Sequence, residues 1–127
     1  MGLTIIAMKI MIVDDSPIAR ELLRDMFETA GHEVVAEAET LSGALESYRA
    51  HKPDLPTLDL SLAGTNGLDI MKALRRLDAG ARVMIVSGNA QKRAVEASRA
   101  SGASGYLAKP FNLDELLAAV KAMGLPG

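Results

Sequence analysis

The chain of 127 residues contains no cysteine, which excludes disulfide bonds, thiolate metal sites and cysteine nucleophiles. This absence fits a reducing compartment, and we expect a cytoplasmic protein. Neither sign of charge dominates, because the formal net charge is -2, so we expect neither nucleic acid nor a membrane as a partner. The first apolar stretch, residues 3–8, is far too short to cross a bilayer and has no basic leader before it.

What the sequence does contain is the composition of a folded domain. Hydrophobic residues make up 49% and charged residues 24%, and 127 residues can bury a sizeable core. No second domain, internal repeat, linker or low-complexity tract stands out. We expect a flexible or loosely paired N-terminal extension over residues 1–8, one domain over residues 9–124 and a short tail over residues 125–127.

Short apolar runs alternate with longer stretches of helical periodicity. The runs predict five strands, at residues 9–13, 34–36, 55–60, 83–86 and 106–108. The periodic stretches predict helices from Pro17 to Gly31, from Leu41 to before Pro53, and over residues 67–77, 90–100 and 113–123. The runs at 11–13 and 83–86 are apolar on both faces, as in strands that helices cover on both sides. We therefore predict an α/β domain with a parallel sheet.

The carboxyl ends of four predicted strands carry reactive side chains, and an open parallel sheet binds its ligands beyond these ends. In chain order the residues are Asp14 and Asp15, then Asp59, then Ser87 and Gly88, then Lys109. No local helix or turn preference explains why four separate strands carry them at the same end. We predict that they converge at one edge of the sheet.

The chemistry of this set points to a cation and a phosphoryl group. Three neighbouring carboxylates repel one another unless a cation or protons intervene, and ligation by oxygen alone favours a hard ion, Mg²⁺ before Ca²⁺ or Mn²⁺. Lys109 is a compact positive charge that suits a phosphate oxygen, and Ser87 can donate a hydrogen bond to the same anion. A metal and a lysine around an aspartate are what phosphoryl transfer needs to neutralise charge.

Five short motifs, in this order and each near a strand end, carry a family resemblance. They are IVDDS at 12–16, PDLPTLDL at 53–60, TNG at 65–67, VSG at 86–88 and GYLAKPF at 105–111. On these motifs the chain resembles the receiver domain of two-component response regulators over residues 9–123. The resemblance implies a flavodoxin-like, doubly wound fold with five helices around a five-stranded parallel sheet of order 2-1-3-4-5.

The resemblance also implies a role for each site residue. Asp59 would be the phosphoacceptor, with Asp15 and Asp59 as direct Mg²⁺ ligands (Mn²⁺ being a possible substitute), Asp14 as a ligand through water, and the backbone carbonyl of Ser61 as a further ligand. Ser87 and Lys109 would bind the phosphoryl oxygens, and Tyr106 would be either a switch that follows Ser87 or a simple packing residue. Ser61 and Asn89 would tune the phosphate lifetime, and the Lys109–Pro110 bond would be cis.

The implied function is that of a stand-alone phosphoacceptor switch, which is not an enzyme although it assists its own phosphorylation and dephosphorylation. A sensor histidine kinase or a phosphotransfer protein would supply the phosphoryl group. With no output domain expected, the signal would leave through a protein contact on the face of residues 90–100, 106–108 and 113–123, in chemotaxis or in a phosphorelay. His32 and His51 lie far from the expected site, and we expect both to be solvated.

Three other functions remain open from the residues. An aspartyl-phosphate hydrolase of the phosphatase type would need a carboxylate two residues beyond the nucleophile, where this chain has Ser61. A flavin or nucleotide binder would need a Gly-, Ser- or Thr-rich loop in place of the acidic pair after the first strand. A docking module that works unphosphorylated would not need the acidic set. Three departures from the family pattern are Pro56, at the start of an expected central strand, Ala63, where proline is usual, and Ser87, where threonine is also frequent.

Overall fold

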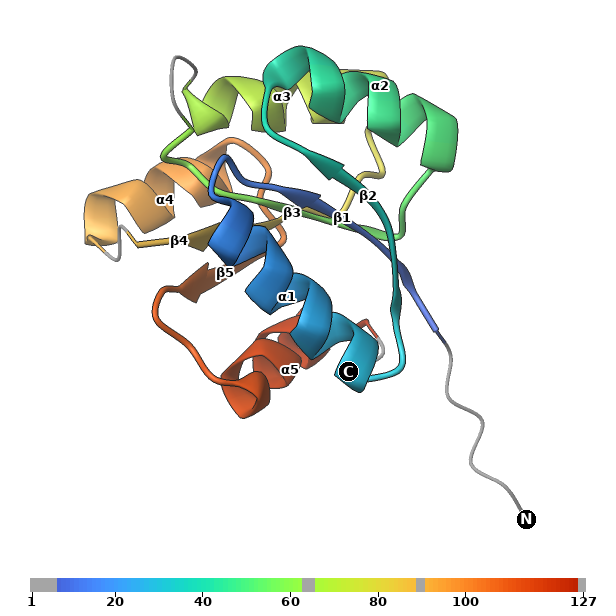
Figure 1. Ribbon diagram of the computed structural model, residues 1–127. Helices are drawn as coiled ribbons and strands as arrows, with labels where there is room; N and C mark the ends of the chain where they lie inside the picture. Colours follow the sequence, from blue (N-terminus) through green and yellow to red (C-terminus); the bar gives the residue numbers. More distant parts are fainter. Residues whose placement is uncertain (1–6, 63–65, 89–90, 126–127) are drawn as a thin grey trace.

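The computed structural model describes residues 7–62, 66–88 and 91–125, in which five parallel strands form one sheet. The strands are β1 (Lys9–Val13), β2 (Glu33–Ala38), β3 (Leu55–Leu58), β4 (Met84–Ser87) and β5 (Gly105–Ala108). Their spatial order is β2-β1-β3-β4-β5, with every neighbouring pair parallel (Figure 1). This order confirms the predicted flavodoxin-like topology, in which β1 and β3 lie in the middle.

Five helices connect the strands: α1 (Pro17–Thr29), α2 (Leu41–His51), α3 (Gly67–Leu77), α4 (Lys92–Ala100) and α5 (Leu113–Ala122). Helices α1 and α5 cover one face of the sheet, and α2 and α3 cover the other (Figure 1). None of the helices in the described part of the chain is long and apolar enough to cross a membrane.

The hydrophobic core consists of two clusters, one on each face of the sheet. Strand β1 supplies both, because Met11 and Val13 belong to the cluster with α2 and α3, while Ile10 and Ile12 belong to the cluster with α1 and α5. Successive side chains of a strand point to opposite faces, so a central strand must be apolar at every position. The apolar run that predicted β1 therefore fixes this strand in the centre of the sheet.

Side-chain caps begin the helices that follow β1 and β3. The Ser16 side chain accepts a hydrogen bond from the Ala19 amide, and Pro17 occupies the first turn of α1, as the sequence predicts. The Asn66 side chain caps α3 through the Leu68 amide. The caps therefore define where α1 and α3 begin after these two strands.

The strand boundaries differ from the predictions by one to a few residues. β2 extends over Glu33–Ala38 because it pairs with β1 from Lys9 to Val13, with one shift of register at Val35. β3 ends at Leu58, which leaves Asp59 just beyond the strand, and β4 spans Met84–Ser87 because Ser87 pairs with Ala108. α4 begins at Lys92, and Ala90, where we expected it to begin, lies outside the described residues.

Pro56 lies within β3 and not before it. It pairs with Met11 of β1, but the pairing between β3 and β4 begins only at Thr57. One flank of the strand is therefore free of ladder hydrogen bonds at the proline, which has no N–H to offer there. A second departure, Ala63, lies outside the described residues.

The prediction for His32 was wrong, whereas His51 is exposed as expected. His32 is only 5% exposed, lies edge-on to Phe27 and accepts a hydrogen bond at Nδ1 from the Met8 amide at 3.0 Å. Burial lowers the pKa of His32, which favours the neutral ring. Met8 itself is buried in the core, and Leu125 packs against the same cluster.

Candidate functional site

Asp14 is the first polar residue after β1, and it is 1% exposed. Its amide donates to the carbonyl of Ala38 at 3.0 Å, which continues the pairing with β2 beyond the strand. Its Oδ1 accepts the Ser16 amide at 2.9 Å. Asp14 is therefore held by its backbone and by its side chain at the carboxyl edge of the sheet.

Asp59 stands at the same edge, directly after β3. It is 7% exposed, and its amide donates to the Val13 carbonyl at 3.0 Å, so β1 holds it in register. Its Oδ1 accepts the Ser61 amide at 2.9 Å. Because β1 and β3 are adjacent parallel strands, two carboxylates that are distant in sequence lie side by side.

Lys109 joins the two carboxylates. Its Nζ lies 2.8 Å from Asp14 Oδ2 and 2.9 Å from Asp59 Oδ2, and its amide donates to the Ser87 carbonyl at 2.9 Å. Burial alone would lower the pKa of Lys109, but the hydrogen bonds and charges of Asp14 and Asp59 outweigh it, so the pKa lies above its ordinary value. The Lys109–Pro110 bond is cis, as the resemblance implies.

Ser87 and Tyr106 lie on the neighbouring strands β4 and β5. Ser87 is fully buried, and Tyr106 is half-buried and packs against the core cluster that contains Ile85. Burial raises the pKa of Tyr106, a side-chain hydrogen bond with Ser87 opposes this rise, and the charge of Asp59 adds to it. The two proposed switch residues are thus in contact with each other and lie within electrostatic reach of Asp59.

The other predicted site residues are placed as follows. Asp15 is half-buried next to Asp14, and Ser61 is exposed directly beyond Asp59. Asn89 lies outside the described residues, as does Thr65 of the TNG motif. Gly88 is exposed, and a side chain added there would meet nothing within 4 Å.

The charges at this edge fit a cation. Two buried carboxylates face one ammonium, which leaves an excess negative charge, and the half-buried Asp15 adds another. Residues 7–62, 66–88 and 91–125 contain no group of three or more acidic, histidine or cysteine side chains close enough to hold a metal ion unaided. Backbone oxygens or water would therefore complete a coordination sphere at this edge, and hard oxygen donors with excess negative charge suit Mg²⁺.

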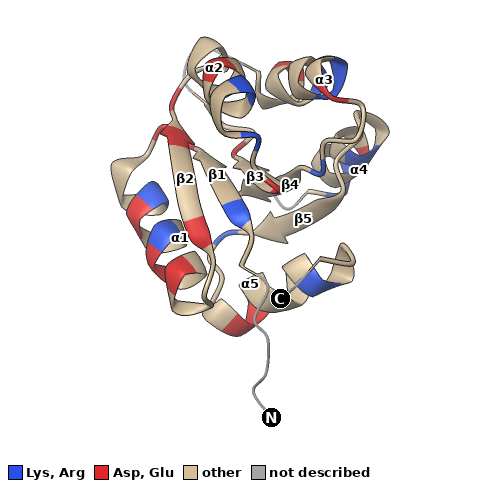
Figure 2. Ribbon diagram, turned by 90° about the vertical axis from the view of Figure 1, so that its right-hand side faces the viewer, with Lys and Arg blue, Asp and Glu red and all other residues tan. Residues whose placement is uncertain are grey.

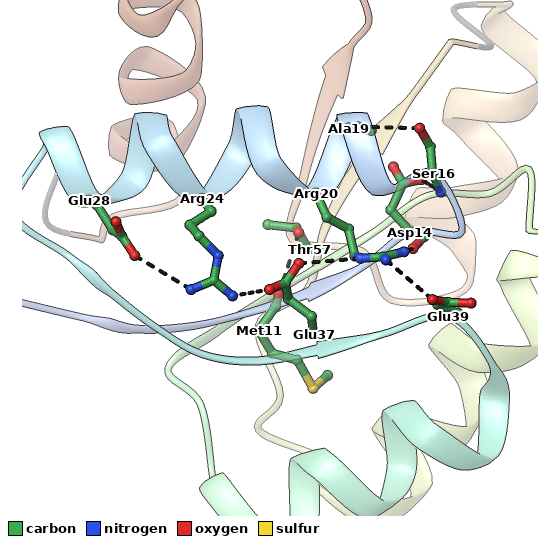
Figure 3. Close-up of polar contacts among 10 residues, drawn as sticks. All are labelled: Met11, Asp14, Ser16, Ala19, Arg20, Arg24, Glu28, Glu37, Glu39 and Thr57. Atoms are coloured by element: carbon green, nitrogen blue, oxygen red, sulfur yellow. Dashed lines mark hydrogen bonds and ion pairs between the residues drawn. The ribbon is translucent and has the colours of Figure 1, made fainter.

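Sequence reasoning missed one residue of this region, Arg20. Its Nη1 donates to the backbone carbonyl of Asp14 at 2.6 Å (Figure 3). No motif could have indicated this contact, because the partner is a main-chain atom and the arginine lies on a helix with a regular amphipathic pattern.

Comparison with known proteins agrees with the fold. The family model of the response regulator receiver domain matches residues 10–121. The chemotaxis protein CheY of Bacillus subtilis (strain 168) is 37% identical over 114 residues, which are 90% of this chain and 95% of that protein. The chain therefore belongs to the receiver-domain family of response regulators.

Two solved structures are similar to the whole domain. A two-component response regulator of the LuxR family from Aurantimonas sp. SI85-9A1 has a TM-score of 0.87 at 34% identity, covering 94% of this chain and 88% of that one. A response regulator from Burkholderia pseudomallei, solved with a phosphorylated aspartic acid, a calcium ion and citrate, has a TM-score of 0.78 at 29% identity, covering 87% of this chain and 65% of that one.

Proposed function

We propose that this receiver accepts a phosphoryl group on Asp59 from a phosphohistidine of a sensor kinase or phosphotransfer protein. The observation that carries the proposal is the buried Asp59 carboxylate, 7% exposed and held 2.9 Å from the Lys109 ammonium at the carboxyl edge of the sheet. Membership of the receiver family supports it, as does the phosphorylated aspartic acid of the Burkholderia relative.

In the proposed transfer, a carboxylate oxygen of Asp59 attacks phosphorus. The P–O bond forms as the P–N bond of the donor breaks, and the electron pair leaves with the imidazole. The Ser61 amide and the Lys109 ammonium each hold one oxygen of Asp59, so the carboxylate is oriented before the donor arrives. Lys109 then offsets charge on the phosphoryl oxygens, while Asp14 keeps its ammonium at the acceptor.

A divalent cation fits this site, and the calcium ion in the Burkholderia relative agrees with that chemistry. The proposed ligands are Asp15, Asp59 and the Ser61 carbonyl directly, with Asp14 through water. When bound, Mg²⁺ would neutralise the carboxylates and the phosphoryl oxygens. Mn²⁺ offers the same hard coordination and should substitute.

The proposed signal starts from the hydrogen bond between Ser87 and Tyr106. A phosphoryl group on Asp59 competes for the Ser87 hydroxyl, so Tyr106 loses its partner and repacks inward. The face formed by α4, β5 and α5 then changes and binds a downstream protein, of a chemotaxis or phosphorelay type. A differential affinity of a few kcal/mol between the two states suffices for a large population shift.

The lifetime of the phosphate should depend on Ser61 and Asn89. Both side chains are small and polar, and Ser61 is exposed beside the acceptor. Water then reaches the phosphoryl group, and we expect hydrolysis within seconds to minutes, assisted by the domain itself. The exposed Ser61 also stands where a phosphatase-type hydrolase would need its second carboxylate, which disfavours that alternative.

Intact-mass measurement tests the proposal. The protein is incubated with acetyl phosphate, with and without Mg²⁺, and in parallel with beryllofluoride as a phosphoryl mimic. A metal-dependent adduct should form in the wild type and be lost in Asp59→Asn. Asp54→Asn is the matched control, because Asp54 is exposed at the opposite end of β3 and should leave the adduct unchanged. Absence of any adduct in the wild type would support the unphosphorylated docking module instead.

A further inference from the structure

Arg20 on α1 connects the acidic site to the edge strand β2. Its side chain is only 14% exposed, although arginine is usually a surface residue. All three guanidinium nitrogens are engaged: Nη1 with the Asp14 carbonyl at 2.6 Å, Nε with Glu37 at 3.2 Å and Nη2 with Glu39 at 3.2 Å (Figure 3). The planar fork of arginine allows these contacts at once, which an ammonium group could not reproduce.

Glu37 is itself held in place. Glu37 also pairs with Arg24, and Arg24 pairs with Glu28 on the same helix, so four charged side chains form a continuous row along α1 and β2 (Figure 3). Figure 2 shows the same interleaving of basic and acidic positions along α1 beside the acidic positions of β2. Glu37 and Glu39, which bind Nε and Nη2, orient the Arg20 guanidinium.

Arg20 completes the immobilisation of Asp14. The amide of Asp14 is bound by Ala38, its Oδ1 by Ser16 and its Oδ2 by Lys109, and Arg20 binds the carbonyl that remains. That carbonyl belongs to the peptide that links Asp14 to Asp15, so its orientation sets where both carboxylates point. A group bound to this peptide therefore acts on the cation site without touching the cation.

We propose that Arg20 is a positioning residue for phosphoryl transfer, which orients the peptide between Asp14 and Asp15 so that Asp15 can bind the divalent cation directly and Asp14 can bind it through water. The inference rests on the proposed function, since it concerns how the same site is organised. Partners that orient metal ligands from outside the coordination sphere typically contribute 10- to 100-fold to metal affinity. Loss of Arg20 should therefore raise the Mg²⁺ concentration for half-maximal phosphorylation about tenfold or more.

Arg24 provides a matched control. It lies one turn further along α1 and also pairs with Glu37, but its second partner is Glu28, whereas Arg20 binds the Asp14 carbonyl. Arg20→Met and Arg24→Met each remove one guanidinium from the same row, so both should lower thermal stability. Only Arg20→Met should change the response to Mg²⁺.

The experiment measures two quantities in wild type, Arg20→Met and Arg24→Met. One is the rate of acetyl phosphate adduct formation against Mg²⁺ concentration, and the other is the increase in thermal midpoint caused by Mg²⁺ alone, without phosphoryl donor. We expect a weaker midpoint increase and a shifted Mg²⁺ dependence only in Arg20→Met. If this variant does not fold, Arg20→Lys replaces it, because it keeps the charge without the fork and should shift the Mg²⁺ dependence in the same direction.

The possible outcomes separate the two proposals. If the wild type forms the adduct and both variants keep its Mg²⁺ dependence, Arg20 is merely structural and the inference is overturned, while the phosphoacceptor function stands. An equal shift in both variants also overturns it, because the effect would then belong to the ion-pair row. If the wild type forms no adduct, the proposed function and the inference fall together.

Discussion

Gly67→Ala offers a sharp test of how the acceptor loop is positioned. Gly67 begins α3, and a Cβ atom there would lie 2.5 Å from Leu60 Cα and 3.0 Å from the Asp59 carbonyl oxygen. Carbon atoms in contact are about 3.5–4.0 Å apart, so the loop after Asp59 would have to move by about 1 Å. The obstructing atoms belong to the backbone and cannot swing aside.

The expected magnitude follows from two opposing effects. Overpacking of this kind costs about 1–3 kcal/mol, and the rigidity of the backbone places Gly67→Ala at the upper end of that range. Alanine in place of glycine within a helix returns at most about 1 kcal/mol. The free energy of unfolding should therefore fall by about 2 kcal/mol, and Asp59 should be displaced from Lys109, which slows adduct formation.

Urea unfolding followed by circular dichroism measures the first effect, and intact mass with acetyl phosphate measures the second. Gly88→Ala is the steric control, since a Cβ there meets nothing within 4 Å, and it should leave the unfolding free energy nearly unchanged. A Gly67→Ala protein as stable as the wild type would refute the argument that close backbone approach requires glycine at this position.

Three further predictions concern single side chains. Lys109→Met should slow adduct formation about 10²-fold at saturating Mg²⁺, because the phosphoryl oxygens lose a fixed positive charge; an unchanged rate by intact mass would contradict that role. Because burial lowers the pKa of His32, the unfolded chain binds the proton more readily, so the free energy of unfolding should fall as pH drops below about 6.5, by at most about 1.4 kcal/mol per pH unit from this residue. Urea unfolding at several pH values should show a weaker dependence of this free energy on pH in His32→Phe than in the wild type. An equal dependence in both proteins would assign the effect to other groups. Tyr48→Phe should lower the free energy of unfolding by about 1 kcal/mol, since the Tyr48 hydroxyl donates to Asp78 at 2.8 Å and the pKa of Tyr48 is raised to about 12. If Tyr48→Phe unfolds at the same temperature as the wild type, this hydrogen bond makes no net contribution to stability.

The parallel sheet and the convergence of the acidic site could be predicted because they follow from patterns along single strands, whereas the strand order came from the family resemblance. An apolar run that ends in Asp14 or Asp59 indicates both a buried parallel strand and the edge at which its polar residue emerges. Lys109 could be added because the fifth strand ends in the same way. The exact ends of the strands could not be predicted from the sequence, since Ser87 joins β4 only through its pairing with Ala108 on another strand.

Two features of single side chains lay beyond sequence reasoning. The burial of His32 depends on Phe27 and on the Met8 amide, which reach it only after α1 and β2 have packed. The contact of Arg20 with the Asp14 carbonyl depends on main-chain geometry that no residue pattern records. Both cases concern tertiary contacts of polar groups, whose burial is decided by their neighbours and not by their own polarity.

The Lys109 ammonium pairs with both Asp14 and Asp59, so a phosphoryl group bound at Asp59 would change how strongly the site binds a cation beside Asp14. If the proposed phosphoryl group drew Lys109 toward itself, the Asp14 carboxylate would be left with less compensating charge and would hold the proposed cation more tightly. By thermodynamic reciprocity, a cation that is already bound must then favour the arrival of that anion by the same factor. Metal and phosphoryl group should consequently behave as mutually reinforcing ligands, and neither affinity has a fixed value unless the concentration of the other is specified.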